Sequence, residues 1–544
     1  MFLVIVPIVL LIYASFVESL GVGPDVLTLD NYIRALTSPY TYSTLVSSVV
    51  FAVGASALSL ILGTLVAWIL ERTNVPFRSI FIGIVLVPLV LPGILETIAW
   101  VFLLSPQFGY LNAFLQGLFG LESAPVSVFT MPGMIWIQGT SNVPLVVLLM
   151  TAAFRSMDPS LEESASMSGA GTGQVVRRVS LPLMLPAIAS VLLLLVVRGI
   201  EAVEVPALVG IPSRIFVFTS EIFLAFGDTP PDYGLGSALA VGLFLFTIIG
   251  VWLYLRTTRQ SERYQTVTGK AFRPRKMDLG RGRWLALGFM TLYFLVVVAA
   301  PLAVIMWASF LPFFGPPSAD MLSRVTLANY EALLADTDFH EALRNSILLA
   351  IGAATATVML TSAIAWIVYR SKVRGAKILD FLAFLPIAIP GIVLGMALIT
   401  QYITLPIPIY GTMWVLLIAY VTKYIPYGMR ATSGAMLQIH RELEEAGATS
   451  GASPFQTFRR ILLPLLVPGL AAGWIYICIV SFREFSTSVL LAGPDSRVLS
   501  VLLYYMYEQG QATLVAAAGV VMITVLMVTV AVFYKISGKF GIST

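Results

Sequence analysis

The segment that decides the fold is LEESASMSGAGTGQVVRRVSLPLMLP, residues 161–186, because the chain contains a second copy of it. The second copy, LEEAGATSGASPFQTFRRILLPLLVP, occupies residues 443–468. It aligns with the first at an offset of 282 without a gap, and 13 of the 26 positions are identical. Both copies are polar segments between long apolar stretches. The chain is therefore predicted to contain an internal repeat built around this segment.

Shorter matches extend the repeat towards the start of each copy. Thr-Leu-x-Asn-Tyr begins at residues 28 and 326, Ala-Trp at 67 and 365, and Pro-x-x-x-Pro-Gly at 88 and 386, all at an offset of 298. The offset is 16 smaller in the long segment (298 against 282). We expect an insertion in the first copy to account for this difference, most simply in the loop over residues 105–125.

The composition is typical of an integral membrane protein. Of the 544 residues, 58% are hydrophobic and only 11% are charged, and the mean hydropathy is +0.91, outside the range of soluble globular proteins. A membrane helix needs roughly 20 mostly apolar residues. We predict an all-α protein with about twelve spans. They cover residues 1–16, 42–70, 80–104, 128–154, 183–209, 234–255, 284–311, 342–369, 378–403, 411–429, 464–490 and 514–534.

The distribution of positive charge predicts the orientation of these spans. Lys and Arg accumulate in the cytoplasmic loops of membrane proteins. With a cytoplasmic amino terminus, the cytoplasmic intervals hold 24 of the 32 Lys and Arg residues and the opposite intervals hold four; the other four fall in or beside spans. Both termini are therefore predicted to be cytoplasmic. The first span lacks a basic n-region and is expected to be a membrane helix, not a signal peptide.

The repeat divides the chain into two six-helix halves, residues 1–256 and 284–544. Each half carries one copy of the polar loop, at residues 155–182 and 436–464. Because six is even, both halves enter and leave on the same side, which predicts a parallel repeat. The basic segment 257–283 is predicted to be a cytoplasmic linker along the membrane surface. Specific binding of lipid or nucleic acid by the linker is the less favoured alternative, and the net charge of +4 indicates no nucleic-acid partner.

Each polar loop is predicted to form two short helices. In the first copy, Ser160 and Glu163 have the spacing of a capping box at a helix start. Gly169 and Gly451 are suited to end the first helix in the left-handed conformation. A second short helix, starting at a Ser-Pro pair in the second copy, is expected over residues 453–464 and should end near the Leu-Pro pair.

These loops resemble the EAA loops of permease subunits of binding-protein-dependent ABC importers. The resemblance rests on Glu-Ser-Ala-x-x-x-Gly at 163–169 and Glu-Ala-Gly-x-x-x-Gly at 445–451, each followed by Leu-Pro. Ser164 and Gly447 replace alanines of the motif. The resemblance implies a type I importer fold and a coupling helix that sits in a groove of an ATPase subunit. It assigns this role to Glu162, Glu163, Ser164, Ala165, Gly169, Arg177, Arg178, Leu181 and Pro182, and to Glu444, Glu445, Ala446, Gly447, Gly451, Arg459, Arg460, Leu463 and Pro464. The alternative is that the loops merely join helices.

The same resemblance implies the partners. No Gly-x-x-x-x-Gly-Lys-[Ser/Thr] phosphate loop occurs, so the chain is expected to be a transport subunit without enzymatic activity or a cofactor of its own. ATP and Mg would act through two copies of a cytoplasmic ATPase subunit. A periplasmic or lipid-anchored binding protein would deliver substrate to this subunit in the bacterial inner membrane. One cysteine and two histidines argue against a thiolate or histidine metal centre.

Several features lie within the predicted spans. The Pro-x-x-x-Pro-Gly motifs should break or kink the third and ninth spans, and a structural kink is favoured over a substrate contact. Arg198, Glu201 and Glu204 are predicted to share one helical face of the fifth span. Arg483 and Glu484 occupy the corresponding place in the eleventh, where Glu201 aligns with Glu484 if one residue is inserted.

Two interpretations of these charges stay open. In one, Arg198 pairs with Glu201 and the charges lock helices together. In the other, Glu201, Glu204 and Glu484 line the translocation route and attract a cation, while the arginines prevent its permanent capture. Carboxylates suit a hard ion such as ferric iron.

Iron(III) is the predicted substrate, because the fused two-half layout is similar to that of iron(III)-type permeases. Thiamine, phosphonate, polyamines and sulfate remain alternatives. A secondary transporter of the major facilitator type is less favoured, because its Gly-x-x-x-Asp-Arg-x-Gly-Arg-Arg signature is missing from the loop at residues 71–78. An intramembrane enzyme would need clustered histidine, cysteine or aspartate side chains.

Overall fold

The computed structural model describes residues 2–18, 26–157, 159–227, 230–261, 277–371, 373–405, 407–440 and 442–539. Within these ranges the chain forms helices and turns, with three isolated β-bridges. The first half contains α1 (Phe2–Ser15), α2 (Asp30–Thr37), α3 (Pro39–Arg72), α4 (Arg78–Leu86), η1 (Val87–Leu89), α5 (Gly93–Leu104), α6 (Tyr110–Phe119), α7 (Met131–Ser156), α8 (Pro159–Met167), α9 (Thr172–Val175), η2 (Val176–Ser180), α10 (Leu181–Ile200), η3 (Pro206–Gly210), α11 (Phe218–Gly227) and α12 (Tyr233–Ser261).

The second half repeats this order. It contains α13 (Gly282–Tyr293), η5 (Phe294–Ala299), α14 (Ala300–Ser309), α15 (Ala319–Ser323), α16 (Ala328–Ala335), α17 (Thr337–Tyr369), α18 (Ala376–Phe384), η6 (Leu385–Ala388), α19 (Gly391–Thr404), α20 (Met413–Gln438), α21 (Glu442–Thr449), α22 (Pro454–Thr457), η7 (Phe458–Leu462), α23 (Leu463–Phe482), α24 (Ser488–Leu491), η8 (Pro494–Ser496), α25 (Leu499–Glu508) and α26 (Ala512–Lys539).

Eight described helices are long and apolar enough to cross a membrane, and two bent helix pairs raise the count to ten. The two predicted spans outside this set are those of α1 and α20. α1 has only 14 residues, and α20 carries Lys423 and Arg430 among its apolar side chains. The all-α membrane fold is thus as predicted, with fewer fully apolar spans than twelve.

The repeat is visible in the hydrogen bonds. The Asn31 amide donates to the carbonyl oxygens of Ser15 and Val17 at the end of α1. Asn329, 298 residues later, donates in the same way to Ser309 and to the carbonyl that follows α14 by two residues. The Thr-Leu-x-Asn-Tyr motif therefore fixes the chain to the end of the first helix in each half.

Both Pro-x-x-x-Pro-Gly motifs break their helices, as predicted. α4 with η1 meets α5 at 101°, and α18 with η6 meets α19 at 110°. In each case the second proline is in an extended conformation directly before the glycine that starts the next helix. A proline supplies no backbone donor, so the carbonyls on the preceding turn need other partners.

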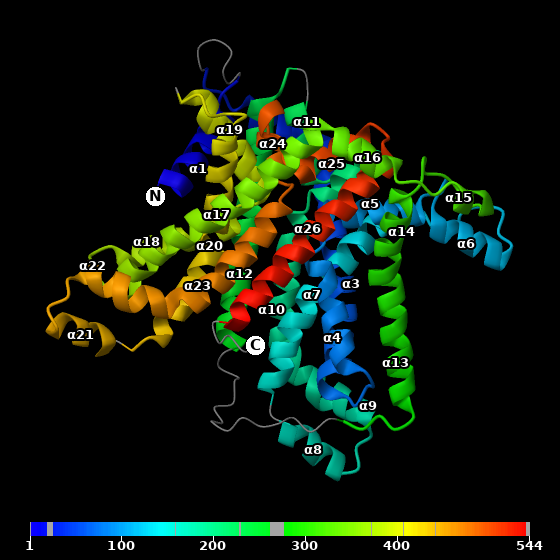
Figure 1. The fold of residues 1–544 in the computed structure, drawn as a ribbon, viewed down its shortest axis with the longest axis horizontal. Helices are drawn as coiled ribbons and strands as arrows, with labels where there is room; N and C mark the ends of the chain where they lie inside the picture. The colour runs from blue at the N-terminus through cyan, green and yellow to red at the C-terminus, as the bar shows by residue number, and fades with distance from the viewer. Residues whose placement is uncertain are drawn as a thin grey trace.

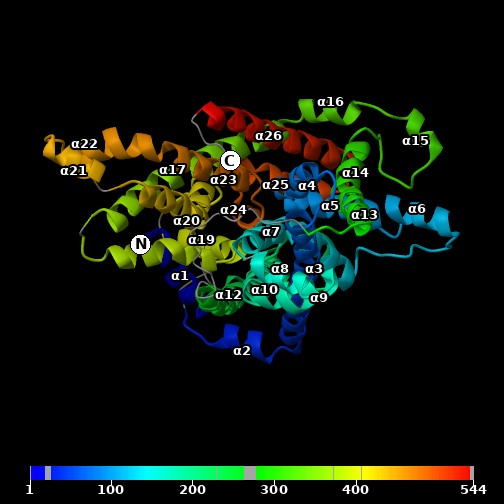
Figure 2. The same ribbon diagram turned by 90° about the horizontal axis from the view of Figure 1, so that it is seen from below.

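The two halves exchange their first helices. α1 packs against α12 of its own half and against α19 of the second half, while α14 packs against α5 of the first half and against α26. Figure 1 shows α13 and α14 running along the first-half bundle, and the same arrangement is seen from below in Figure 2. The bent helices α5 and α19 therefore lie where the halves meet.

Most of the predicted linker, residues 262–276, lies outside the described residues. Its first residues, 257–261, continue α12, and its end is fixed to the first half. Met277 N–H donates to the Arg72 carbonyl at 2.8 Å, and the Asn74 amide donates to the Asp278 carboxylate at 2.6 Å. The backbone N–H of Gly280 and the Asn74 amide both bond that carboxylate, which lowers the pKa of Asp278.

Candidate functional site

The two polar loops fold alike. Each consists of a short helix, a glycine with positive φ and a second short helix: α8, Gly169 and α9 in the first copy, and α21, Gly451 and α22 in the second. The φ angles of the glycines are +85° and +82°, as the sequence predicts. A Cβ atom at either glycine would meet no atom within 4 Å. These positions require glycine because of backbone conformation, not because of crowding.

The predicted start of the second short helix is confirmed in the second copy. The predicted start of the first short helix in the first copy differs from the structure. The Ser453 hydroxyl accepts from Gln456 N–H, and the Gln456 side chain accepts from Ser453 N–H, which is a reciprocal cap on α22. In the first copy α8 begins at Pro159. Ser160 is therefore the second residue of the helix and not its N-cap, so the predicted capping box with Glu163 is wrong.

The prediction that the second short helix ends near Leu-Pro is wrong. The chain is helical without interruption over Gly173–Ile200 and Phe455–Phe482. The five residues before each Leu-Pro pair form a π-helical turn, η2 and η7. The wider turn changes the hydrogen-bond register where proline lacks a donor, so the helix continues.

Each loop is anchored to the membrane domain by an arginine and a glutamate at equivalent positions. Arg72, at the end of α3 and 2% exposed, lies 3.6 Å from Glu162, and the Ser180 hydroxyl donates to Glu162 at 2.6 Å. Arg370, 298 residues after Arg72, lies 3.1 Å from Glu444. Glu162 is thus a buried internal contact and not part of the exposed face.

Arg370 also holds the end of the preceding helix. Its guanidinium donates to the carbonyls of Met436 and Ile439, at 2.7 and 2.5 Å. These carbonyls lie at the end of α20, where the second loop begins. One side chain therefore fixes both the entrance of the loop and its first helix.

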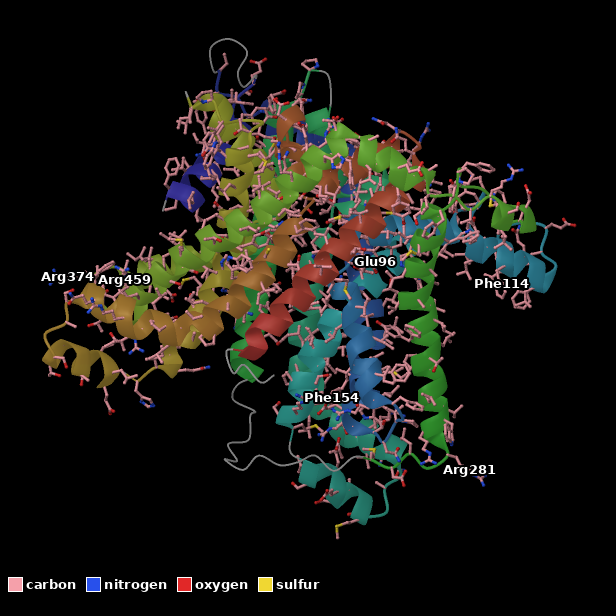
Figure 3. The ribbon with its side chains drawn as sticks, viewed as in Figure 1. Glu96, Phe114, Phe154, Arg281, Arg374 and Arg459 are labelled. Atoms are coloured by element: carbon pink, nitrogen blue, oxygen red, sulfur yellow. The ribbon has the colours of Figure 1, made fainter. Side chains whose placement is uncertain are left out.

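The outer faces of the loops are exposed. Met167 is 90% exposed at the end of α8. Gly447 is buried, and a Cβ there would lie 2.8 Å from Ile461, so glycine allows α21 to pack closely on η7. Figure 1 shows α8 below the helices of the first half and α21 beyond the left end of the helices of the second half. Figure 3 labels Arg459 near the second loop. The exposed predicted residues are Glu163, Ser164, Gly169, Arg177, Arg178, Leu181 and Pro182, and Glu445, Ala446, Gly451, Arg459, Arg460 and Pro464; Ala165, Glu444 and Leu463 are partly buried.

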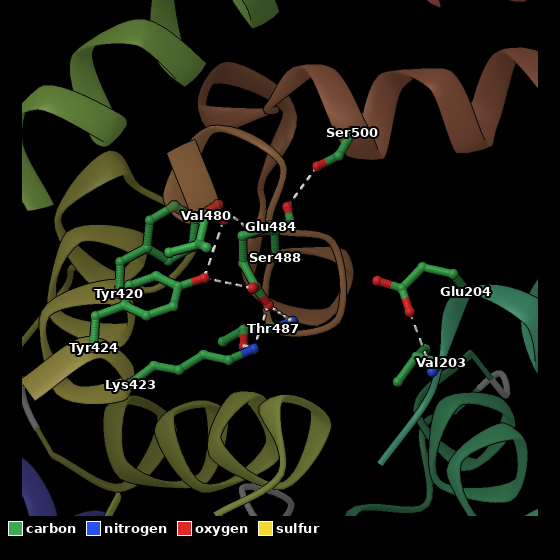
Figure 4. Close-up of polar contacts among 10 residues, drawn as sticks. All are labelled: Val203, Glu204, Tyr420, Lys423, Tyr424, Val480, Glu484, Thr487, Ser488 and Ser500. Atoms are coloured by element: carbon green, nitrogen blue, oxygen red, sulfur yellow. Dashed lines mark hydrogen bonds and ion pairs between the residues drawn. The ribbon is translucent and has the colours of Figure 1, made fainter. Parts of the chain in front are cut away.

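A second group of functional candidates lies where α10 and α23 end. Glu484 accepts from Lys423 Nζ at 2.6 Å, from the Tyr424 hydroxyl at 2.7 Å and from Thr487 N–H at 3.1 Å. Figure 4 shows this cluster and the Glu204 side chain, which points towards it from the first half. The partner of Glu484 is therefore a lysine of α20 and not its neighbour in sequence.

The predicted common face of Arg198, Glu201 and Glu204 is wrong. α10 ends at Ile200, so the helix is interrupted between Arg198 and Glu204. Arg198 is exposed, and no ion pair joins it to Glu201 in the described residues. One carboxylate oxygen of Glu201 is buried without a hydrogen-bond partner.

The alignment of Glu201 with Glu484 is also corrected. The Ala202 carbonyl accepts from the Thr219 hydroxyl at 2.6 Å, and the Glu484 carbonyl accepts from the Ser500 hydroxyl at 2.5 Å. The backbone thus places Ala202 and Glu484 in equivalent environments. The ungapped offset of 282 holds through the ends of both helices.

It follows that Glu201 corresponds to Arg483, and the equivalent positions carry opposite charges. Arg483 donates to the carbonyls of Leu89 and Leu91, at 2.6 and 3.0 Å, in the broken helix of the first half. At the break of the second half, the Ala388 carbonyl accepts from the hydroxyl of Thr247, in α12 of the first half, at 2.8 Å. Each half therefore supplies a donor to the break of the other half.

A comparison with known protein families agrees with the presence of a polar loop and a broken helix in each half. The family described as "Binding-protein-dependent transport system inner membrane component" matches residues 59–260 and matches again over residues 359–539. Each match includes one polar loop and one broken helix. The chain belongs to this family. It is the permease component of a binding-protein-dependent ABC importer, with the permease domain present twice.

Two relatives that match most of this permease are named as ferric transport proteins. It is 26% identical over 99% of its length to the ferric transport system permease protein FbpB of Actinobacillus pleuropneumoniae, covering 76% of that protein. It is 27% identical over 88% of its length to a putative ferric transport system permease protein of Haemophilus influenzae, covering 74%. The spermidine/putrescine permease protein PotC of Escherichia coli is 26% identical over 37% of this chain and 75% of its own.

Sequence reasoning missed the anchors of the permease loops. Arg72 and Arg370 enter the sequence analysis only through the total of cytoplasmic Lys and Arg residues, although both follow the tryptophan of the Ala-Trp motif by four residues. Glu71 was missed as well: it is buried and accepts from Arg78 and Arg155, which joins α3, α4 and α7. The shared offset of 298 was the signal that could have identified the arginine pair.

Proposed function

We propose that the permease takes up iron(III) and that its two loops couple transport to separate ATPase subunits. The observation that carries this proposal is the duplicated loop geometry. Both loops have a short helix, a left-handed glycine and an Arg–Glu anchor at equivalent positions. A simple connector between helices would need none of these features. Two equivalent attachment points fit two copies of one ATPase subunit, which would bind ATP and Mg.

The uninterrupted helices give a mechanical route from the loops to the charged cluster. Gly173–Ile200 and Phe455–Phe482 are each 28 residues long, which corresponds to about 42 Å at 1.5 Å per residue. One end of each helix carries an exposed arginine pair, and the other end leads directly into Glu201 or Arg483. Displacement of a loop by the ATPase would therefore move these charges at the interface between the halves.

The cytoplasm would contain the loops, the linker and both termini, in agreement with the distribution of positive charge. The opposite surface would receive substrate from a periplasmic or lipid-anchored binding protein. Closure of the ATPase pair under the loops and its release would expose the interface first to one side and then to the other.

Iron(III) is favoured over the other substrates by the carboxylates at the interface. Glu201 has an unpartnered carboxylate oxygen, and Glu204 lies beside Gly93 at the break of α5. Such oxygens attract hard cations and disfavour anions such as sulfate and phosphonate. A polyamine is the second candidate, since it is also cationic and a polyamine permease shares part of the sequence.

Reconstitution tests the cargo. The permease is placed in proteoliposomes with its ATPase, and the cognate binding protein is loaded with radioactive iron(III) or spermidine. We expect ATP-dependent accumulation of iron. Accumulation of spermidine in place of iron would contradict the iron proposal and leave the coupling proposal intact.

The double substitution Gly169→Ala with Gly451→Ala tests the coupling. A left-handed conformation costs a residue with a Cβ roughly 1–2 kcal/mol, so the first helices of both loops should be displaced. We expect ATP hydrolysis that no longer drives uptake. The matched control is Gly169→Asn with Gly451→Asn, because asparagine tolerates this conformation better. Unchanged uptake in the alanine variant would contradict the coupling role.

A further inference from the structure

The predicted insertion in the first half forms an exposed helix with no charged residue. α6 has the sequence YLNAFLQGLF, and Phe114, Leu118 and Phe119 are 62%, 61% and 67% exposed. A helix that faces water carries polar or charged side chains on its exposed side. Three large apolar side chains on one short helix form a patch of the kind that contacts another apolar phase.

The position of α6 is fixed by one buried side chain. The Asn112 amide donates to the carbonyls of Leu104, Ser105 and Val126, at 3.0, 3.2 and 2.7 Å. Leu104 is the last residue of α5, so α6 leaves the bundle at the point where this span ends. Figure 1 shows α6 running sideways from the bundle, across the direction of α13 and α14.

An aromatic cluster ties α6 to the end of a second span. The Trp307 indole donates to the Tyr110 hydroxyl at 3.2 Å, and Phe314 stacks on Phe102 at 4.1 Å between ring centroids. Trp307 lies two residues before the end of α14. Tyr and Trp are enriched at the surface of the hydrocarbon layer. The ends of α5 and α14 and the start of α6 therefore lie at one level.

The second half contributes apolar residues beside α6. The Tyr110 hydroxyl contacts the Met321 sulfur of α15 at 3.6 Å. Phe313 and Leu322 are 51% and 68% exposed. Figures 1 and 2 both show α6 and α15 projecting on the same side of the molecule. We define the apolar pad as Phe114, Leu118, Phe119, Phe313 and Leu322.

We propose that the apolar pad lies on the bilayer and inserts into the lipid headgroup region, at the end of the spans away from α8. Three observations favour lipid over a protein partner. The pad starts at the level where two spans end, and α6 has no charge for a polar partner to recognise. The span that ends beside α6 also exposes apolar side chains, among them Leu295 and Met306. Interfacial helices lie in the membrane plane in this way.

Site-directed labelling tests the proposal on the full chain. Cys478 is the only cysteine, so Cys478→Ala gives a background into which Phe114→Cys or Leu118→Cys is introduced. The matched control is Glu122→Cys, on the exposed chain after α6. Each cysteine carries an environment-sensitive fluorophore, and the protein is reconstituted in phosphatidylethanolamine and phosphatidylglycerol vesicles.

We expect doxyl-labelled lipid to reduce the emission at positions 114 and 118, and aqueous iodide to reduce it at position 122. Quenching by iodide at all three positions would overturn the proposal. The cognate binding protein, added to the same vesicles, provides the second measurement. Iodide quenching at 114 and 118 that disappears on its addition would show that the pad is a protein docking surface, which also contradicts membrane contact. Neither result depends on the identity of the transported substrate.

Discussion

Lys423 and Glu484 show how single charges are tolerated inside this permease. The lysine side chain is 21% exposed and the glutamate 9%, and the carboxylate accepts two further hydrogen bonds from Tyr424 and Thr487. The position equivalent to Lys423 is Ser141, which donates to Glu96 at 2.8 Å. The two halves therefore place different residues beside a buried carboxylate.

Removing one partner of the Lys423–Glu484 pair should lower the free energy of unfolding more than removing both partners. Glu484→Gln leaves the Lys423 ammonium without its counter-ion, and breaking a buried pair costs roughly 3–5 kcal/mol. Lys423→Met with Glu484→Gln should recover most of this loss. Unfolding of the purified variants in detergent, followed by circular dichroism, measures the difference. Equal losses of stability in the single and double variants would contradict the explanation that an unpaired buried charge causes the loss.

Glu201 should matter for transport more than for stability. Its buried carboxylate oxygen has no partner, so Glu201→Gln removes a charge without breaking a bond. We expect iron uptake in proteoliposomes to fall about ten-fold, which corresponds to about 1.4 kcal/mol, with normal assembly with the ATPase. Glu331→Gln on the exposed face of α16 is the control. Uptake equal to that of the control would remove Glu201 from the translocation route.

At the scale of helices, the breaks between α4 and α5 and between α18 and α19 are the features that need support from elsewhere. The carbonyls they free are satisfied from the opposite half, by Arg483 in one case and Thr247 in the other. A charged donor contributes more than a hydroxyl. The break between α4 and α5 should therefore depend more strongly on Arg483 than the break between α18 and α19 depends on Thr247.

This difference is measurable. Arg483→Met removes two charge-assisted hydrogen bonds, each worth about 1.5–3 kcal/mol. Thr247→Val removes one neutral hydroxyl donor, shared by the carbonyls of Phe244 and Ala388 and worth about 1 kcal/mol. We expect the arginine variant to lose more thermal stability. We also expect its interface to open, so that a cysteine introduced near Leu91 reacts with a thiol reagent. A larger loss in Thr247→Val would contradict the argument.

The sequence predicts the breaks of α5 and α19 but not the ends of α10 and α23, for a physical reason. Proline and glycine mark the breaks directly, because proline removes a donor and glycine permits a sharp turn. Between Ile200 and Val209 the chain is apolar apart from Glu201 and Glu204, so hydropathy gives no clear sign that the helix stops. Helical spacing then placed Glu201 and Glu204 on a face that does not exist. The loop glycines were predictable because the left-handed conformation favours one residue type.

At the scale of the whole molecule, the exchange of first helices joins the halves. α1 packs on α19 and α14 on α5, so each half completes the other. The parallel repeat could be predicted from the offsets 298 and 282, but this exchange could not, because apolar helices carry no signal for their partner in the sequence.

The exchange predicts that the linker is dispensable for assembly. Residues 1–261 and 277–544, produced together as separate chains, should copurify through an affinity tag on one of them. A first fragment without α1 should copurify less well, since it loses its contacts with α19. Copurification that is the same with and without α1 would show that the exchanged helix does not hold the halves together.

Opposite charges at residues 201 and 483 have a consequence for how such a protein can be encoded. A homodimer of one six-helix chain carries the same side chain at both sites, either two acids or two bases facing each other across the axis. Gene duplication followed by fusion lifts this restriction, because each copy then mutates independently. The glutamate and the arginine are a difference that only a single polypeptide, or two distinct genes, can specify.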